Sequence, residues 1–151
     1  MFIYRLSLTE YAGELTGEGS RLFGGRWNKA GTRCLYTAES RALSVLESLV
    51  NDTISTTPKK LSIITLKAPD ENHLIIKPAQ LPENWNKAEV SEHTQSFGSA
   101  LLDKAGYLII RVPSVVIPQE YNYIINPVHP DMKKVSIIDV SDFSFDTRLK
   151  K

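Results

Sequence analysis

The fold is decided by residues 33–50, RCLYTAESRALSVLESLV, in which a short apolar strand runs directly into a helix. Arg33–Tyr36 is typical of a strand. From Ser40 to Val50, apolar residues recur at three- and four-residue intervals, which predicts a helix with one buried face. Thr37 or Ser40 is suited to cap its N-terminus. Glu47 falls at the edge of the apolar stripe, so we expect its carboxylate at the rim of the core, where a cleft would lie.

The stretch before this strand is rich in glycine. Six of the eight glycines fall within residues 13–31. Because glycine tolerates positive φ and lets a ligand approach the backbone, such a cluster indicates either irregular turns or a binding loop. The cluster contains the run Phe23-Gly24-Gly25-Arg26-Trp27-Asn28, in which one arginine is framed by two glycines and an aromatic ring.

Strands and helices are interleaved along the rest of the chain. A second helix is predicted from Ser91 to Ala105, with Gly106 as its stop. The expected strands and β-branched runs are Phe2–Leu6, Leu61–Leu66, Leu74–Ile76, Tyr107–Val112, Val115–Ile117, Tyr121–Ile125 and Val135–Val140. This order predicts an α+β fold rather than a doubly wound sheet. We expect residues 1–151 to form one compact domain of mixed, largely antiparallel sheets with a few helices.

Length and charge narrow the classes of protein. A chain of 151 residues with 42% hydrophobic and 23% charged residues is ordinary for one globular domain. Eighteen Lys and Arg against seventeen Asp and Glu leave a net charge of +1, which does not favour nucleic acid or an anionic membrane as partner. Neither a secretory signal nor an apolar run of about 18 residues is present, so we expect a cytoplasmic location.

Several well-known catalytic signatures are missing from the sequence. There is no phosphate-binding P-loop, no Gly-x-Ser-x-Gly and no His-Glu-x-x-His. The three histidines are scattered, so no metal site is expected. The single cysteine, Cys34, lies in a strand-like run and is interpreted as a small buried hydrophobe.

Arg26, Tyr36 and Glu47 together suit an anionic, aromatic ligand. An arginine fork matches phosphate, and a tyrosine ring can stack on a base. A carboxylate near a glycosidic carbon can stabilise an oxocarbenium-like transition state. In the alternative interpretation, Tyr36 and Trp27 are core aromatics, Arg26 pairs with Glu47, and the glycines only make turns.

Several motifs, found in a fixed order along the chain, help to choose between a ligand site and simple core packing. They are Tyr4-Arg5-Leu6, Gly24-Gly25-Arg26-Trp27-Asn28, Leu35-Tyr36, the Glu47 helix, Val112-Pro113-Ser114 and Asn126-Pro127-x-His129-Pro130. This arrangement resembles the RES domain, and the resemblance runs from residue 4 to about residue 148. One departure is Leu6, which stands where some relatives have a tyrosine.

The resemblance implies a fold similar to ADP-ribosyltransferases and diphtheria-type toxins. It also implies a toxin of a bacterial toxin–antitoxin pair that consumes NAD⁺, with a Xre-like helix-turn-helix antitoxin covering the active cleft. Neither direct contact with nucleic acid nor a membrane is expected. A homodimer is left open, because no interface pattern stands out.

Carried over residue by residue, the resemblance gives the site. Glu47, Arg26 and Tyr36 are expected to be catalytic. Arg5, Ser114 and Asn126 are expected to bind substrate. NAD⁺ would be the substrate, with no cofactor and no metal.

The acceptor is left open at this point. Water would make the protein a glycohydrolase, inorganic phosphate a phosphorylase, and a protein side chain a mono-ADP-ribosyltransferase. A rival of another class is a non-catalytic module that binds a nucleotide or a partner in the same cleft.

Overall fold

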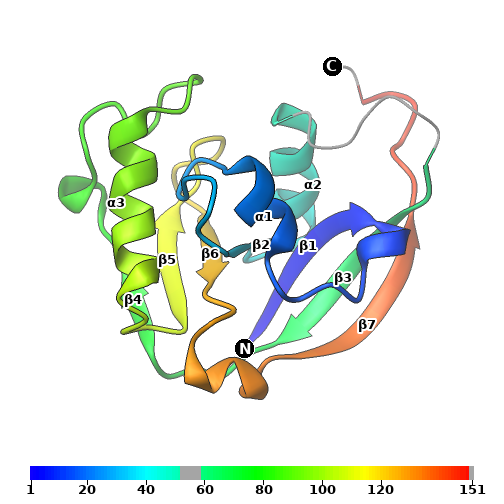
Figure 1. Cartoon of the computed structure of the whole chain (residues 1–151). Coiled ribbons are helices and arrows are strands. Elements are labelled where there is room, and N and C mark those ends of the chain that lie inside the picture. Colours follow the sequence, from blue (N-terminus) through cyan, green and yellow to red (C-terminus); the bar gives the residue numbers. More distant parts are fainter. Residues whose placement is uncertain (52–58, 150–151) are drawn as a thin grey trace.

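A seven-stranded sheet organises the chain, with the strand order β4-β5-β6-β2-β1-β3-β7. The structure is a computed structural model that describes residues 1–51 and 59–149. The strands are β1 (Phe2–Leu8), β2 (Leu35–Ala38), β3 (Leu61–Lys67), β4 (His73–Ile75), β5 (Ile109–Pro113), β6 (Tyr121–Ile125) and β7 (Ser136–Phe143) (Figure 1). Among the described strands, the β4–β5 pair is parallel and the other pairs in the sheet are antiparallel. The predicted α+β class with a mixed, largely antiparallel sheet is confirmed.

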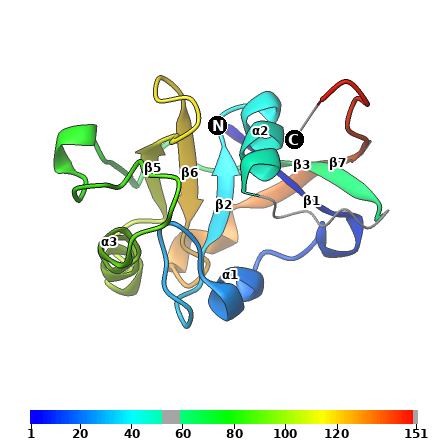
Figure 2. The same cartoon turned by 90° about the horizontal axis from the view of Figure 1, so that it is seen from above.

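The sheet divides into two halves between β1 and β2. These strands share one register pair, Tyr4 with Ala38, whereas β1 and β3 pair along their whole length from Phe2–Lys67 to Leu8–Leu61. Seen from above, β1, β3 and β7 run at a steep angle to β2, β5 and β6 (Figure 2). Strands that part in this way leave a space that neighbouring side chains enclose, and this space contains the site described below.

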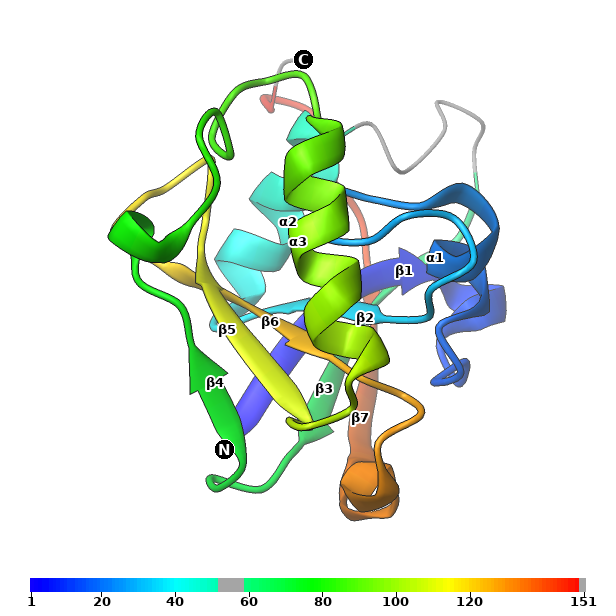
Figure 3. The ribbon, with the colours of Figure 1, turned by 60° about the vertical axis from the view of Figure 1, so that its left-hand side comes forward.

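Two helices begin as the sequence predicts. The helix α2 (Arg41–Val50) is capped by Ser40, whose hydroxyl accepts from the backbone N–H of Leu43 at 3.0 Å. It packs against β1 and β2. The helix α3 (Glu92–Asp103) is capped by Ser91 in the same way. It runs beside β5 (Figure 3).

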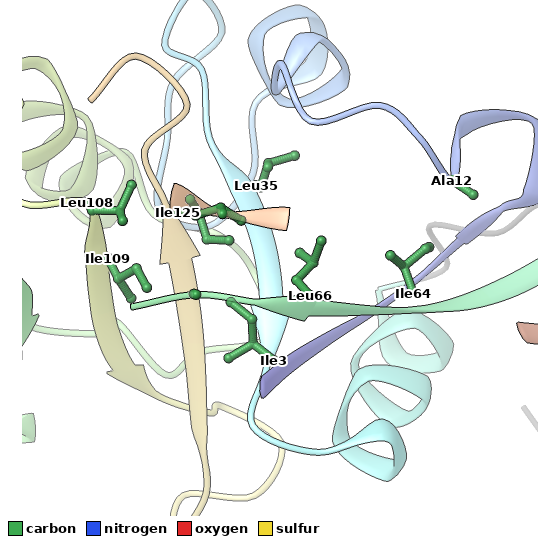
Figure 4. Close-up of a cluster of buried hydrophobic side chains, with 10 residues drawn as sticks. Ile3, Ala12, Leu35, Ile64, Leu66, Leu108, Ile109 and Ile125 are labelled. Atoms are coloured by element: carbon green, nitrogen blue, oxygen red, sulfur yellow. The ribbon is translucent and has the colours of Figure 1, made fainter. Parts of the chain in front are cut away.

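Two buried clusters form the core, and the first of them holds the halves together. Ile3, Ile64 and Leu66 of the β1–β3 half meet Leu35 and Ile109 of the other half (Figure 4). The second cluster lies between α3 and the sheet and consists of Trp27, Cys34, Ile76, Leu102, Ile110, Val112 and Ile124. The interpretations of Cys34 and Trp27 as buried packing residues are therefore confirmed.

Four local expectations need correction. The glycine-rich stretch contains a helix, α1 (Glu18–Phe23), flanked by Gly17 and Gly24, both at positive φ. The strand β2 begins at Leu35 rather than Arg33. Val115–Ile117 is a bend and not a strand. The strand predicted from Tyr107 to Val112 begins at Ile109 and ends at Pro113. Three short 3-10 helices, η1 (Thr9–Tyr11), η2 (Pro78–Gln80) and η3 (Pro130–Lys134), complete the elements.

Two features are absent from residues 1–51 and 59–149. No helix there combines the length and apolar character needed to cross a membrane. No three His, Cys, Asp or Glu side chains in that part gather closely enough to hold a metal ion.

Candidate active site

A cavity of about 670 Å³ lies where β1 and β2 separate. Its wall includes Arg5 from β1, Tyr36 from β2, Arg26 from the loop after α1, and Glu47 from α2. The fold therefore brings four of the six predicted site residues to one space. Ser114 reaches the same place indirectly, and Asn126 does not.

The carboxylate of Glu47 is held by hydrogen bonds to both oxygens. Its Oε1 accepts from Ser114 Oγ and from Asn122 Nδ2, each at 2.7 Å. Its Oε2 accepts from Asn51 Nδ2 at 3.3 Å, one turn further along the chain. Donors of this kind stabilise an ionised carboxylate and fix its direction. Glu47 is thus presented to the cavity as an oriented anion.

The Ser114 hydroxyl has a defined direction. Its Oγ accepts from the backbone N–H groups of Val116 and Ile117, at 3.1 and 3.0 Å. Because these donors fill the oxygen's acceptor positions, the one hydroxyl proton is directed at Glu47. Ser114 is fully buried and does not line the cavity itself. Its hydroxyl contacts Glu47, and its expected role in substrate binding stays a prediction.

Arg26 connects the cavity to the segment before α3. Its Nη1 donates to the carbonyl oxygens of Trp85 and Lys87, at 2.9 and 2.8 Å, and its Nη2 to that of Ala88 at 3.4 Å. Burial lowers the pKa of Arg26, and the nearby charge of Glu47 opposes that shift. The guanidinium therefore stays charged and near Glu47 while it holds one cavity wall in place.

The Tyr36 hydroxyl is used within the protein. It donates to Asn28 Oδ1 at 2.6 Å and accepts from the Trp27 N–H at 3.0 Å. Asn28 is fully buried and donates in turn to the carbonyls of Ser20 and Thr32. Burial raises the pKa of Tyr36 well above its usual value. Tyr36 is therefore neutral at physiological pH, and the ring, not an ionised oxygen, is what it can offer a ligand.

Gly25 allows the Tyr36 ring to lie against the arginine loop. A Cβ at Gly25 would lie 2.7 Å from the Tyr36 hydroxyl oxygen and 2.9 Å from ring carbons. Any larger residue at this position would push the tyrosine out of place.

Arg5 lies on the wall formed by β1. Its Nη1 donates to the Glu14 carbonyl oxygen at 2.9 Å. Burial lowers the pKa of Arg5, opposed by the charge of the Glu14 carboxylate. Arg5 and Arg26 therefore supply two guanidinium groups from different walls of one cavity.

Asn126 has a structural position. It is fully buried, its Nδ2 donates to the Leu102 carbonyl at 2.8 Å, and its Oδ1 accepts from the Val128 N–H at 3.2 Å. These bonds join the end of α3 to the turn after β6. Asn126 does not line the cavity, and its expected role in substrate binding stays a prediction.

No sequence pattern predicted a role for Asn122, Asn51 or Asn28. One signal was available for Asn122, a polar residue within the otherwise apolar and aromatic strand Tyr121–Ile125. A polar group at such a position normally has a specific partner. The partner, Glu47, lies 75 positions away in the sequence, so only the fold could identify it.

The sheet parts between β1 and β2, and the cavity at this place is lined by arginine, tyrosine and glutamate side chains. A family model for the RES domain matches residues 2–147. The match spans nearly the whole chain, so the chain belongs to the RES domain family.

Individual relatives agree with the family match. The chain is 34% identical over 144 residues to the Prs ADP-ribosylating toxin of Sphingobium sp. (strain YBL2), which covers 93% of this chain and 89% of the relative. It is 33% identical to Toxin Res of Yersinia enterocolitica, covering 99% of this chain and 100% of the relative. Toxin Res of Pseudomonas putida is 34% identical, with 99% of each chain covered.

A solved structure supports the fold. The chain superposes on the Mycobacterium tuberculosis MbcT–MbcA toxin–antitoxin complex with a TM-score of 0.76 at 19% identity, covering 95% of this chain and 84% of that chain. At this level of identity the likeness shows the fold.

Proposed function

We propose that this RES-domain protein is a toxin that breaks the bond between nicotinamide and ribose in NAD⁺. The observation that carries the proposal is Glu47, an oriented carboxylate at a cavity that two arginines also line. A fixed negative charge is what a developing oxocarbenium ion requires, and fixed cations are what a pyrophosphate requires.

Each residue has a part in this mechanism. Glu47 stabilises positive charge on the ribose as the bond to nicotinamide breaks. The pyridinium nitrogen of NAD⁺ carries the positive charge before cleavage and takes the bonding electrons, so nicotinamide leaves as a neutral molecule. No general acid is needed, which explains why one carboxylate suffices where glycosidases use two. The ring of Tyr36 stacks near the nicotinamide.

The arginines hold the pyrophosphate. Among the described residues, the hydrogen bonds of Arg26 use both hydrogens of Nη1 and one hydrogen of Nη2, so Nε–H and the second Nη2 hydrogen can bind a phosphate oxygen. Arg5 uses one donor for the Glu14 carbonyl oxygen, and its other N–H groups would bind the ligand. In a partly dry cavity these charge-assisted bonds are stronger than in water.

The acceptor distinguishes the reactions. Transfer to water or phosphate would degrade free NAD⁺, and this is the function we favour. The second candidate is mono-ADP-ribosylation of a protein. It is favoured by one observation, the 34% identity to the Prs ADP-ribosylating toxin.

We also propose an antitoxin partner and a cytoplasmic place of action. The partner proposal is supported by the fold shared with the toxin of the MbcT–MbcA toxin–antitoxin complex. An antitoxin with a Xre-like helix-turn-helix region that covers the cavity would keep NAD⁺ out.

One experiment tests the activity and identifies the acceptor. The purified chain is incubated with NAD⁺, with and without inorganic phosphate and a cell extract, and the products are identified by mass. We expect nicotinamide release together with ADP-ribose, its 1″-phosphate or a modified protein. Glu47→Gln is the matched control, because it keeps the shape of the side chain and removes the charge. Equal release by this variant, or calorimetric binding of NAD⁺ without release by the wild type, would contradict the proposed mechanism.

A further inference from the structure

Phe23 is the most exposed large apolar side chain in the described part of the protein. It ends α1, is 86% exposed, and lines the same cavity as Glu47 and the arginines. A phenylalanine ring in water lacks the stabilisation that burial would contribute. Large aromatic rings left at a cavity mouth are typical of positions that a ligand covers.

Open space, which we call the slot, lies over Gly19 on the same helix. Gly19 and Phe23 are four residues apart on α1, so they share one face of the helix. No heavy atom lies within 4 Å of the position a Cβ would take at Gly19, and Gly19 also lines the cavity. The helix therefore presents a flat ring and an empty strip of backbone on the side that faces the cavity.

The slot and Glu47 belong to different walls. Glu47 is on α2, and the views from above and from the side show α1 and α2 well separated, at opposite ends of β2 (Figures 2 and 3). The chain also supplies Arg5 and Arg26 to the cavity from β1 and from the loop after α1. NAD⁺ has matching parts, since its pyrophosphate separates the nicotinamide riboside from the adenosine.

We propose that the Phe23 ring and the slot over Gly19 bind the adenine base of the dinucleotide by stacking. This inference rests on the proposed function, because it takes the nicotinamide ribose to lie at Glu47. Aromatic stacking accepts a purine without requiring buried hydrogen-bond partners. Val90, also exposed and at the cavity wall, adds apolar surface from the segment before α3.

Binding of ADP-ribose and AMP, measured by calorimetry, tests the subsite without any cleavage. We expect Phe23→Ala to weaken both by about 10-fold, the effect of removing one aromatic face from a stacked base. Phe23→Tyr keeps a ring and should stay within about twofold of the wild type. Gly19→Leu places a side chain in the slot and should weaken the binding of both ligands as much as Phe23→Ala does.

Leu22→Ala is the matched control. Leu22 precedes Phe23 on α1 and is 53% exposed, but it does not line the cavity. Removing either side chain leaves the buried clusters intact, so the two variants should unfold at similar temperatures. Equal ADP-ribose affinity in Phe23→Ala, Leu22→Ala and the wild type would overturn the subsite.

Kinetics provide the second readout. Phe23→Ala should raise the KM for NAD⁺ by about 10-fold with little change in kcat, because adenine lies far from the bond that breaks. Nicotinamide mononucleotide lacks the adenosine half, so the wild type and Phe23→Ala should cleave it at the same rate. If Phe23→Ala lost the same share of activity toward NAD⁺ and toward nicotinamide mononucleotide, the inference would also be overturned. Phe23 would then act at the reacting ribose or on the fold.

The outcomes separate the two proposals. If the wild type binds ADP-ribose through Phe23 but releases no nicotinamide, the proposed function fails and the adenine subsite stands. If NAD⁺ is cleaved with Phe23 making no difference, the function stands and Phe23 is left as a surface for a protein partner. If neither NAD⁺ nor ADP-ribose is bound, both proposals fail.

Discussion

At the scale of single residues, the site depends on polar groups that fix other polar groups. Ser114 and Asn122 share one oxygen of Glu47, and Asn28 holds the hydroxyl of Tyr36. Sequence patterns pointed to Glu47, Arg26 and Tyr36 but could not show these supports. Each support comes from an element that meets its partner only in the folded chain.

Replacement of Asn122 should slow the reaction without weakening substrate binding. Asn122→Ala removes one of the two 2.7 Å hydrogen bonds to Glu47 Oε1. A hydrogen bond to a charged group contributes roughly 1.5–3 kcal/mol, so kcat should fall roughly 10- to 100-fold with KM within about twofold. Steady-state nicotinamide release measures both constants. Asn86→Ala, at an exposed asparagine, is the control. A higher KM at unchanged kcat would assign Asn122 to substrate binding.

Burial of Cys34 makes stability sensitive to alkaline pH. Burial raises the pKa of the Cys34 thiol from 9.0 to about 11. Between these values the unfolded chain has lost the thiol proton and the folded chain has kept it, so the free energy of unfolding falls as pH rises. The contribution is intact below about pH 9, and its loss is on the order of 2 kcal/mol. Urea unfolding of wild type and Cys34→Ala at pH 8 and pH 10.5 measures the difference. Identical pH dependence in the two proteins would refute this effect.

At the scale of elements, two helical glycines differ in the space around them. Gly98 lies on the buried face of α3, where a Cβ would come within 1.9 Å of the Trp27 carbonyl oxygen. Gly19 lies on α1 with open space around its Cβ position. Helix propensity favours alanine over glycine at both positions. The surroundings therefore decide whether alanine stabilises or destabilises the protein.

These two positions make a matched pair of variants. Gly98→Ala should destabilise the protein by roughly 2–4 kcal/mol, because α3 must move away from Trp27 and disturb the cluster beneath it. Gly19→Ala should be neutral or stabilise the protein by about 0.5–1 kcal/mol. Chemical denaturation of both variants measures these changes. A stabilised Gly98→Ala protein would show that α3 does not pack on Trp27 as described.

At the scale of the whole molecule, the site exists because the sheet parts between β1 and β2. The strands that part supply Arg5 and Tyr36, α2 supplies Glu47, and the loop after α1 supplies Arg26. Both halves are tied by one buried cluster, so the opening is held by the core rather than by the ligand.

A toxin that consumes NAD⁺ should stop growth when it is made alone. We expect expression of the chain in bacteria to lower cellular NAD⁺ by several-fold and to arrest growth. The Glu47→Gln chain, expressed to the same level, should do neither. Growth curves and an enzymatic NAD⁺ assay measure both effects. Arrest with unchanged NAD⁺ would instead favour modification of a protein target.

The sequence by itself determined much of this protein. Apolar periodicity and a capping residue located α2, and a glycine stop marked the end of the helix predicted at α3. The family resemblance identified Arg5, Arg26, Tyr36 and Glu47, which all line one cavity. Charge balance and the glycine-rich run indicated a small, localised anion site within a nearly neutral chain. These features are local or depend on residue type, so they can be read along the chain.

Only the tertiary structure decided what the remaining residues do. Ser114 and Asn126 occupy matching motif positions, yet one holds Glu47 and the other joins α3 to a turn. The short helix α1 escaped prediction because its flanking glycines resemble those of an irregular loop. Burial and hydrogen-bond partners arise between segments distant in sequence, and a linear pattern does not record which of them meet.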